Sequence, residues 1–181
     1  MAASLVICPG IHSPELTTGF LQGLNLVPTR DDIFVFPTQD YPAYSGLDIL
    51  RFVENSVPPT TPPIFISFSA GVVGAIAASQ LSSLKSHPIK AFIALDGWGV
   101  PLVGSVPIHR LSHDFFTHWS SALLGRGETS FYADPAVEHL KLWHSPQEVW
   151  GWREVRLGLR NRVSAAIFLK ELLQQYEFPC F

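Results

Sequence analysis

The chain of 181 residues is rich in apolar side chains (47%) and poor in charged ones (15%). This composition excludes a disordered chain, which would be poor in apolar residues. With 12 Lys and Arg against 15 Asp and Glu, the chain has no basic surplus for nucleic-acid phosphates, which excludes an ordinary nucleic-acid binder. Its apolar runs are far shorter than the about 18 residues of a membrane span. The first residues lack the basic region of a signal peptide. We therefore expect one cytoplasmic domain over residues 1–181.

Short apolar runs alternate with helical patterns along most of the chain. We expect strands at residues 5–8, 33–36, 64–68, 90–95, 106–111 and 130–132. We expect helices at residues 14–24, 47–53, 70–84 and 115–124. From Pro146 onward the apolar spacing predicts helix almost to the C-terminus.

This alternation predicts an α/β fold. Short apolar strands connected by helices pair in parallel, with helices on both faces of the sheet. Right-handed crossovers then favour a doubly wound sheet of about six mostly parallel strands, in the order 2-1-3-4-5-6. Ligands bind such sheets at the carboxyl ends of the strands, where the order reverses. The loops at residues 9–13 and 67–71 meet at that point, so we expect the chemistry there.

A candidate nucleophile lies in the second of these loops. An apolar strand passes into a helix of small residues through Ser67-x-Ser69-x-Gly71. This is the context of a nucleophile elbow, a strained turn that needs small residues two positions before and after the nucleophile. The alternative is an ordinary strand followed by a helix that Ser69 caps. The strand before and the small-residue helix after favour the elbow.

With these motifs, residues 4–176 resemble a small serine hydrolase of the α/β-hydrolase superfamily, similar to lipases without a lid domain. The family most often has Gly where this chain has Ser67. The resemblance implies that backbone N–H groups of Ile11 and Ala70 form an oxyanion hole. It also places Gly10 in the loop after the first strand, where Pro9 replaces the usual His. His12 could take over the supporting role of that His.

The resemblance further implies a catalytic base after the last strand of the sheet. His139 lies seven residues before Pro146, which matches the family's closing signature better than His144 does. The family's Gly before this His is Glu138 here.

Two carboxylates are candidates for the acid that orients the base. Asp114 follows the fifth strand, the family's common position, and lies 25 residues before His139. Asp96 follows the fourth strand, a position that some branches use. We favour Asp114 and keep Asp96 open; Asp134, before a Pro, reads better as a turn residue.

These roles predict that the protein cleaves a carboxylic ester through an acyl-enzyme, without a metal or an organic cofactor. Gly10, His12, Trp98 and Tyr41 are the residues that we expect around the substrate. The aromatic side chains favour an apolar acyl, lipid or isoprenoid ester. The alternative function is a non-catalytic protein of the same fold that binds an apolar ligand or a protein partner.

Histidine clustering raises the question of a metal site. His109 and His113 are four residues apart, and His118 follows closely. In a strand, this spacing places the two side chains too far apart for one ion. We therefore expect no metal at these histidines.

Overall fold

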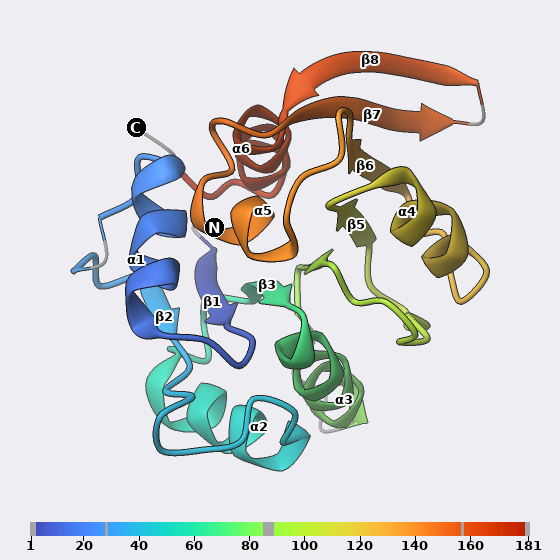
Figure 1. Ribbon diagram of the computed structural model, residues 1–181. Coiled ribbons are helices and arrows are strands. Elements are labelled where there is room, and N and C mark those ends of the chain that lie inside the picture. Colours follow the sequence, from blue (N-terminus) through green and yellow to red (C-terminus); the bar gives the residue numbers. More distant parts are fainter. Residues whose placement is uncertain (1–2, 28, 85–88, 157, 180–181) are drawn as a thin grey trace.

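The computed structural model describes residues 3–27, 29–84, 89–156 and 158–179, and its strands form one eight-stranded sheet (Figure 1). The strands are β1 (Ser4–Cys8), β2 (Ile33–Val35), β3 (Pro63–Phe68), β4 (Ala91–Leu95), β5 (Ile108–Ser112), β6 (Thr129–Ala133), β7 (Trp150–Arg156) and β8 (Leu159–Ser164). Their order is β2-β1-β3-β4-β5-β6-β7-β8. The first six strands pair in parallel and follow the predicted order, whereas β7 is antiparallel to both of its neighbours. The predicted α/β class and mostly parallel sheet are confirmed, but the expected count of about six strands was too low.

Helices cover both faces of this sheet. They are α1 (Pro14–Gly23), α2 (Gly46–Ser56), α3 (Ala70–Leu84), α4 (Phe115–Ala122), α5 (His139–His144) and α6 (Ala165–Gln175). In Figure 1, α2 and α3 lie on one face, and α1, α5 and α6 lie on the other. The helix α4 packs beside β5 and β6. Among the described residues, no helix combines the length and the hydrophobicity needed to cross a membrane.

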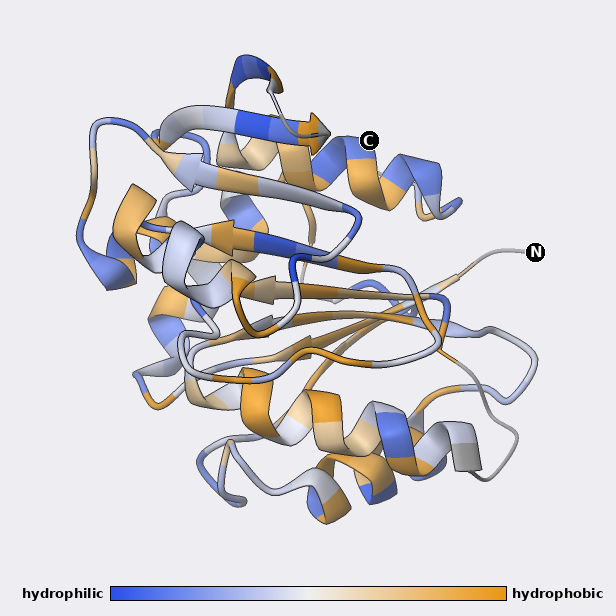
Figure 2. Cartoon of the chain, turned by 90° about the vertical axis from the view of Figure 1, so that its right-hand side faces the viewer, coloured by the Kyte–Doolittle hydropathy of each residue, from blue (hydrophilic) through white to orange (hydrophobic). Residues whose placement is uncertain are grey.

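Alternating side chains of the central strands build two hydrophobic cores. Leu5 and Ile7 of β1 point to the core under α1, α5 and α6, whereas Val6 and Cys8 point to the core under α2 and α3. Because side chains of a strand alternate between faces, a strand buried on both sides reads as a continuous apolar run. Figure 2 shows this hydrophobic centre, with a more hydrophilic strand at the edge of the sheet. Burial raises the pKa of the Cys8 thiol, which is free; Cys180 lies outside the described residues.

The helix predicted from Pro146 to the end is correct only for its last part, α6. Residues 150–164 instead form the hairpin β7–β8, which extends the sheet beyond β6. Gly158, with φ of +83°, lies in the connection between these strands. The hairpin buries few apolar side chains, and its outer strand exposes Arg160 and Arg162. Sparse apolar positions fit a helix as well as an edge strand, so periodicity did not separate the two.

Candidate active site

A strained turn joins β3 to α3. The strand ends at Phe68 and the helix begins at Ala70, and Ser69 between them has a φ of +52°. A left-handed backbone is uncommon for residues other than Gly, and it persists only where the surroundings enforce it. Here the Ser69 N–H donates to the carbonyl of Leu95 (3.0 Å), and the Ser69 carbonyl accepts from the N–H of Val72 (3.0 Å). The strand–turn–helix expected around Ser69 is therefore present.

Two glycines allow the chain to pack closely around this turn. A Cβ on Gly71 would collide with the backbone carbonyls of Cys8 and Pro9. A Cβ on Gly10 would lie 3.0 Å from the Cβ of Ser69. Each added methyl group would therefore force the β1 loop away from the turn. The loop at residues 9–11 consequently lies directly beside Ser69.

Ser67, two residues before Ser69, is accommodated inside the sheet. Its side chain is buried, and its Oγ donates a hydrogen bond to the carbonyl of Ile93 on β4 (3.2 Å). A buried hydroxyl group is tolerated when it has a partner of this kind. The departure at Ser67 thus leaves the turn intact.

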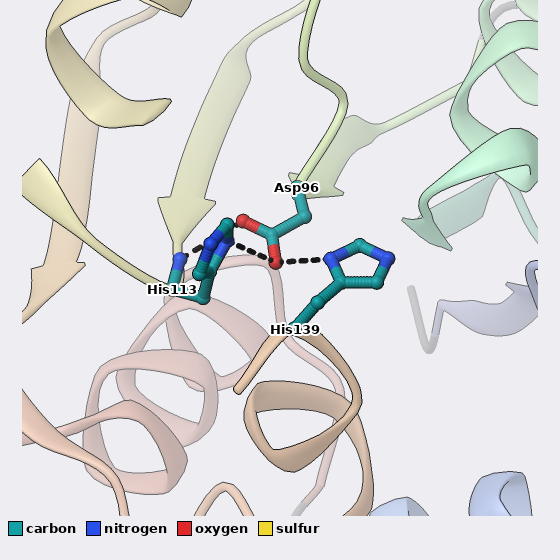
Figure 3. Close-up of side chains that lie close together, drawn as sticks. All are labelled: Asp96, His113 and His139. Carbon is teal, nitrogen blue, oxygen red and sulfur yellow. Dashed lines mark hydrogen bonds and ion pairs between the residues drawn. The ribbon is translucent and has the colours of Figure 1, made fainter. Parts of the chain in front are cut away.

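The neighbouring strand β4 is followed by a second left-handed residue, Asp96, with a φ of +50°. Its side chain is only 1% exposed and lies among two histidines (Figure 3). Oδ2 of Asp96 accepts from Nδ1 of His139 (2.8 Å) and from Nδ1 of His113 (3.0 Å). Oδ1 accepts from the backbone N–H of His113 (2.9 Å). One buried carboxylate thus holds two imidazole rings.

Asp114, the acid favoured from the sequence, has a different environment. Its Oδ1 accepts from the backbone N–H of Thr117 (2.6 Å), so the carboxylate caps the N-terminus of α4. Its Oδ2 lies 3.4 Å from Nε2 of His113. The carboxylate that bonds His139 belongs to Asp96. The start of α4 directs the side chain of Asp114, the favoured candidate from the sequence, to the helix rather than to His139.

Aromatic stacking positions the ring of His139. The imidazole stacks on Phe68, with ring centroids 4.6 Å apart. Phe68 stacks in turn on Trp143 of α5 (5.0 Å), and Trp143 stacks on Phe20 of α1 (3.8 Å). Phe68 immediately precedes Ser69, so this stack brings His139 to the side of the strained turn. In Figure 3, the second ring nitrogen of His139 points away from Asp96.

The surroundings of Asp96 favour the ionised form of its carboxyl group. Burial would raise the pKa of Asp96, but hydrogen bonds from His113 and His139 outweigh that effect, and the pKa is lowered. The hydrogen bond to Asp96 raises the pKa of His113 above its ordinary value of 6.5, against the opposing effect of partial burial. Asp96 is therefore an ionised group that can hold an imidazolium.

The candidate nucleophile and the candidate base do not form a hydrogen bond with each other in this structure. Within the described residues, Ser69 Oγ and His139 Nε2 have no hydrogen-bond partner. Such contacts are often long in structures without substrate and tighten when substrate binds. The arrangement can accept a proton at Nε2 once a hydroxyl group approaches.

Two of the residues expected around the substrate, Gly10 and His12, lie close to the turn at Ser69. Gly10 contacts the turn at Ser69, and His12 lies against the rings of Phe68 (5.7 Å) and Trp143 (6.1 Å). Nδ1 of His12 is 2.9 Å from the carbonyl of Ser13, whereas its Nε2 is buried without a partner. This atom is one of three buried side-chain nitrogen or oxygen atoms without a partner in the described part of the chain.

Trp98 and Tyr41, the other two residues expected around the substrate, are both exposed. The exposed Trp98 donates through Nε1 to Ser120 Oγ on α4 (3.1 Å). Tyr41 is also exposed, with its ring centroid 6.0 Å from that of Phe36. Neither Trp98 nor Tyr41 lines the two cavities beside the loop at residues 9–11, which are described below, whereas Tyr44 lines one of them.

Two adjoining cavities lie beside the loop that carries Gly10 and Ile11. Their volumes are about 360 and 230 Å³, and four residues line both. The shared residues are His12, Pro14, Thr38 and Gln39. The described lining residues include no Asp, Glu, Lys or Arg, and His12 and Tyr44 are the two with a titratable side chain. This region suits an uncharged group of modest size.

The three residues Asp96, His113 and His139 are also the described group whose donor atoms could hold a metal ion, since these atoms lie within 4.8 Å of one another. Both Nδ1 atoms already face the same carboxylate oxygen at hydrogen-bond distance. A cation would have to displace both hydrogen bonds. His109 and His118 lie elsewhere: His109 bonds Thr129 and Tyr176, and His118 pairs with Glu154.

His113 is the residue of this cluster that the sequence analysis raised only in connection with a metal site, whereas the structure places it as a partner of Asp96. A signal was present, because His113 follows β5 as Asp96 follows β4, and parallel strands end at the same edge of a sheet.

No protein-family profile and no curated protein matches the chain. Among solved structures, it is similar to YbtT, a type II thioesterase from the yersiniabactin NRPS/PKS biosynthetic pathway. The identity is 19% and the TM-score is 0.40, over 52% of this chain. The matched part spans 41% of YbtT. A likeness this distant carries no argument about activity.

Proposed function

We propose that this protein is a serine hydrolase of the α/β-hydrolase type that cleaves a carboxylic ester through Ser69, His139 and Asp96. The observation that carries the proposal is the 2.8 Å hydrogen bond from His139 to the buried Asp96, beside a strained Ser69. A nucleophile, a base and an orienting acid in this chain order (Ser, Asp, His) are typical of such hydrolases. The proposed enzyme is one domain over residues 1–181.

The mechanism begins with a proton transfer from Ser69 Oγ to His139 Nε2. As the proton leaves, Oγ forms a bond to the carbonyl carbon of the ester. Asp96 keeps the Nδ1–H tautomer of His139 and stabilises the imidazolium that forms. The alcohol then leaves with the proton from His139. Water attacks the acyl-enzyme by the same route, giving the free acid and restoring Ser69.

Backbone donors complete the proposed site. Ala70 opens α3 directly after the nucleophile, and Ile11 follows the close-packed Gly10. Their N–H groups are proposed to hold the oxyanion of the tetrahedral intermediate. Preorganised donors of this kind supply a large part of the rate, about 10²–10³-fold for one donor. The N-terminus of α3 adds a favourable dipole for negative charge.

The ester is proposed to be uncharged and apolar. The described residues that line the cavities beside Ile11 include no Asp, Glu, Lys or Arg. Burying an ionised group there would cost free energy without a partner of opposite charge.

One observation favours a second candidate function, a non-catalytic protein that binds a ligand. In the described structure, Ser69 Oγ and His139 Nε2 have no hydrogen bond to each other. A protein that only binds needs no such contact.

A fluorophosphonate probe separates the two functions. The proposed enzyme is labelled at one site per chain, and Ser69→Ala abolishes both labelling and p-nitrophenyl ester hydrolysis. Loss of the nucleophile removes on the order of 10⁶-fold in rate in a serine hydrolase. Ser67→Ala is the matched control, because it removes a buried serine hydroxyl from the same turn and keeps labelling. Absence of labelling in folded wild-type protein would favour the binding protein.

A further inference from the structure

We propose that His113 is a positioning residue that fixes the Asp96 carboxylate for His139 and, when protonated, slows the reaction. The proposal rests on the proposed ester hydrolysis and goes beyond it by assigning a second histidine to the same acid. It rests on the contacts among Asp96, which follows β4, His113, which follows β5, and His139, which begins α5.

His113 forms hydrogen bonds with both oxygens of the Asp96 carboxylate. Its backbone N–H donates to Oδ1 of Asp96 (2.9 Å), and its ring Nδ1 bonds Oδ2 (3.0 Å). The backbone of Asp96 is fixed as well, because its N–H donates to the carbonyl of Leu111 (2.8 Å). The side chain of Asp96 is 1% exposed, so solvent cannot replace a lost contact. Removing the ring of His113 would leave one carboxylate hydrogen bond unmade in a buried place, which is costly.

The orientation of the ring excludes His113 as the base. Its Nδ1 faces Asp96, and its Nε2 faces Asp114 at 3.4 Å. His139 is the ring that stacks on Phe68, next to Ser69. The two imidazoles meet edge to face, with centroids 5.7 Å apart. They therefore share one carboxylate, while only His139 stacks on Phe68, the residue before the candidate nucleophile.

The charge of His113 changes what Asp96 can do. Around its ring lie the carboxylates of Asp96, Asp114 and Glu138, and the imidazole of His139. A proton on His113 places a cation 3.0 Å from Oδ2. During the reaction the same oxygen must stabilise the imidazolium of His139. Two cations on one carboxylate repel each other, so the transition state loses stabilisation.

Two substitutions separate the effect of the hydrogen bond from His113 to Asp96 from the effect of the charge on His113. His113→Asn keeps an N–H donor near the place of Nδ1 but cannot become charged. His113→Leu removes the donor altogether. We expect His113→Leu to lower kcat about tenfold with little change in KM, since the substrate does not touch this residue. Circular dichroism and the melting temperature establish that each variant is folded.

The pH profile tests the charge. The hydrogen bond to Asp96 raises the pKa of His113 above 6.5, so wild type carries the extra cation at pH 6.5 and below. We expect the ratio of kcat for His113→Asn to kcat for wild type to rise about tenfold between about pH 9 and about pH 5.5. A flat ratio, or full kcat in His113→Leu, would overturn the proposal.

Failure of this proposal is distinguishable from failure of the proposed function. If the probe labels Ser69 while both His113 variants behave as wild type at every pH, the hydrolase survives and His113 has no positioning role. If folded wild type is neither labelled nor active, the hydrolase fails. In that case, NMR titration of His113 tests whether His113 pairs with Asp96. Asp96→Asn should bring the pKa of His113 down toward its ordinary value, and an unchanged titration would overturn the pairing.

Discussion

The ring of Phe68 stacks on the imidazole of His139, with planes 25° apart and centroids 4.6 Å apart. Phe68 is the last residue of β3, and Ser69 follows it directly. The strand that ends at the candidate nucleophile therefore also positions the candidate base. Behind Phe68 the stack continues through Trp143 to Phe20, so α1 and α5 both support the ring.

We expect Phe68→Leu to lower kcat for ester hydrolysis about tenfold, because the imidazole loses the flat surface that sets its plane. The free energy of unfolding should also fall, by about 1 kcal/mol, as for other shape changes in a packed core. Phe92→Leu is the matched control. Phe92 is equally buried but belongs to the core under α2 and α3, so this variant should lose stability and keep kcat.

Equal kcat in the two variants would show that the stack does not position His139. The measurements are steady-state kinetics with p-nitrophenyl esters and urea unfolding of both proteins.

The choice between the two acids gives the next prediction. Asp96→Asn should lower the ester-hydrolysis rate by about 10⁴, because an amide at this place favours the wrong tautomer of His139. Asp114→Asn should retain most of the rate. At most it weakens the cap of α4, where loss of a capping carboxylate costs about 1 kcal/mol in stability. Activity that survives in Asp96→Asn and disappears in Asp114→Asn would contradict this assignment.

The sequence was sufficient for the parts of the fold that depend on burial and chain order. Strands buried on both sides read as apolar runs, which is why β1, β3 and β4 were predicted close to their observed bounds. The turn at Ser69 was predicted from its small neighbours, and the backbone contacts at Gly71 show why a small residue is needed there.

The acid could not be decided in this way. Asp96 and Asp114 both follow parallel strands, so chain order brings both to the same edge of the sheet. What separates them is the direction of each side chain. The left-handed backbone of Asp96 and the helix start after Asp114 set those directions. Periodicity gives no signal for the left-handed backbone at Asp96, so the direction of that side chain could not be predicted from the sequence.

The cavities beside Ile11 predict where an acyl chain would lie. Gln39 lines both cavities and is exposed, so Gln39→Trp should fill part of this space without disturbing the core. We expect its kcat/KM for an octanoyl ester to fall about tenfold, and for an acetyl ester to change little, because only the longer chain needs the space. Asp40→Trp is the control, since Asp40 is exposed and lines neither cavity. A chain-length profile that is the same in both variants would place the acyl group elsewhere.

The last prediction concerns stability and the buried His109, which takes no part in the proposed site. Its ring lies inside the molecule between Thr129 and Tyr176, with Nδ1 2.7 Å from Thr129 Oγ1 and Nε2 2.7 Å from the Tyr176 hydroxyl. Burial lowers the pKa of His109 from 6.5 to about 4. Burial also raises the pKa of Tyr176 to about 12, so its hydroxyl group stays protonated.

Because the folded state keeps His109 neutral, the unfolded state binds more protons below pH 6.5. The stability from this group is therefore complete above pH 6.5 and is lost as the pH falls toward about 4. The loss amounts to about 3 kcal/mol if the full shift is realised. Urea unfolding of wild type and His109→Gln across this range measures it. The difference in unfolding free energy between the two proteins should shrink as the pH falls, since glutamine does not titrate. A difference that stays constant with pH would show that His109 is not held neutral by burial.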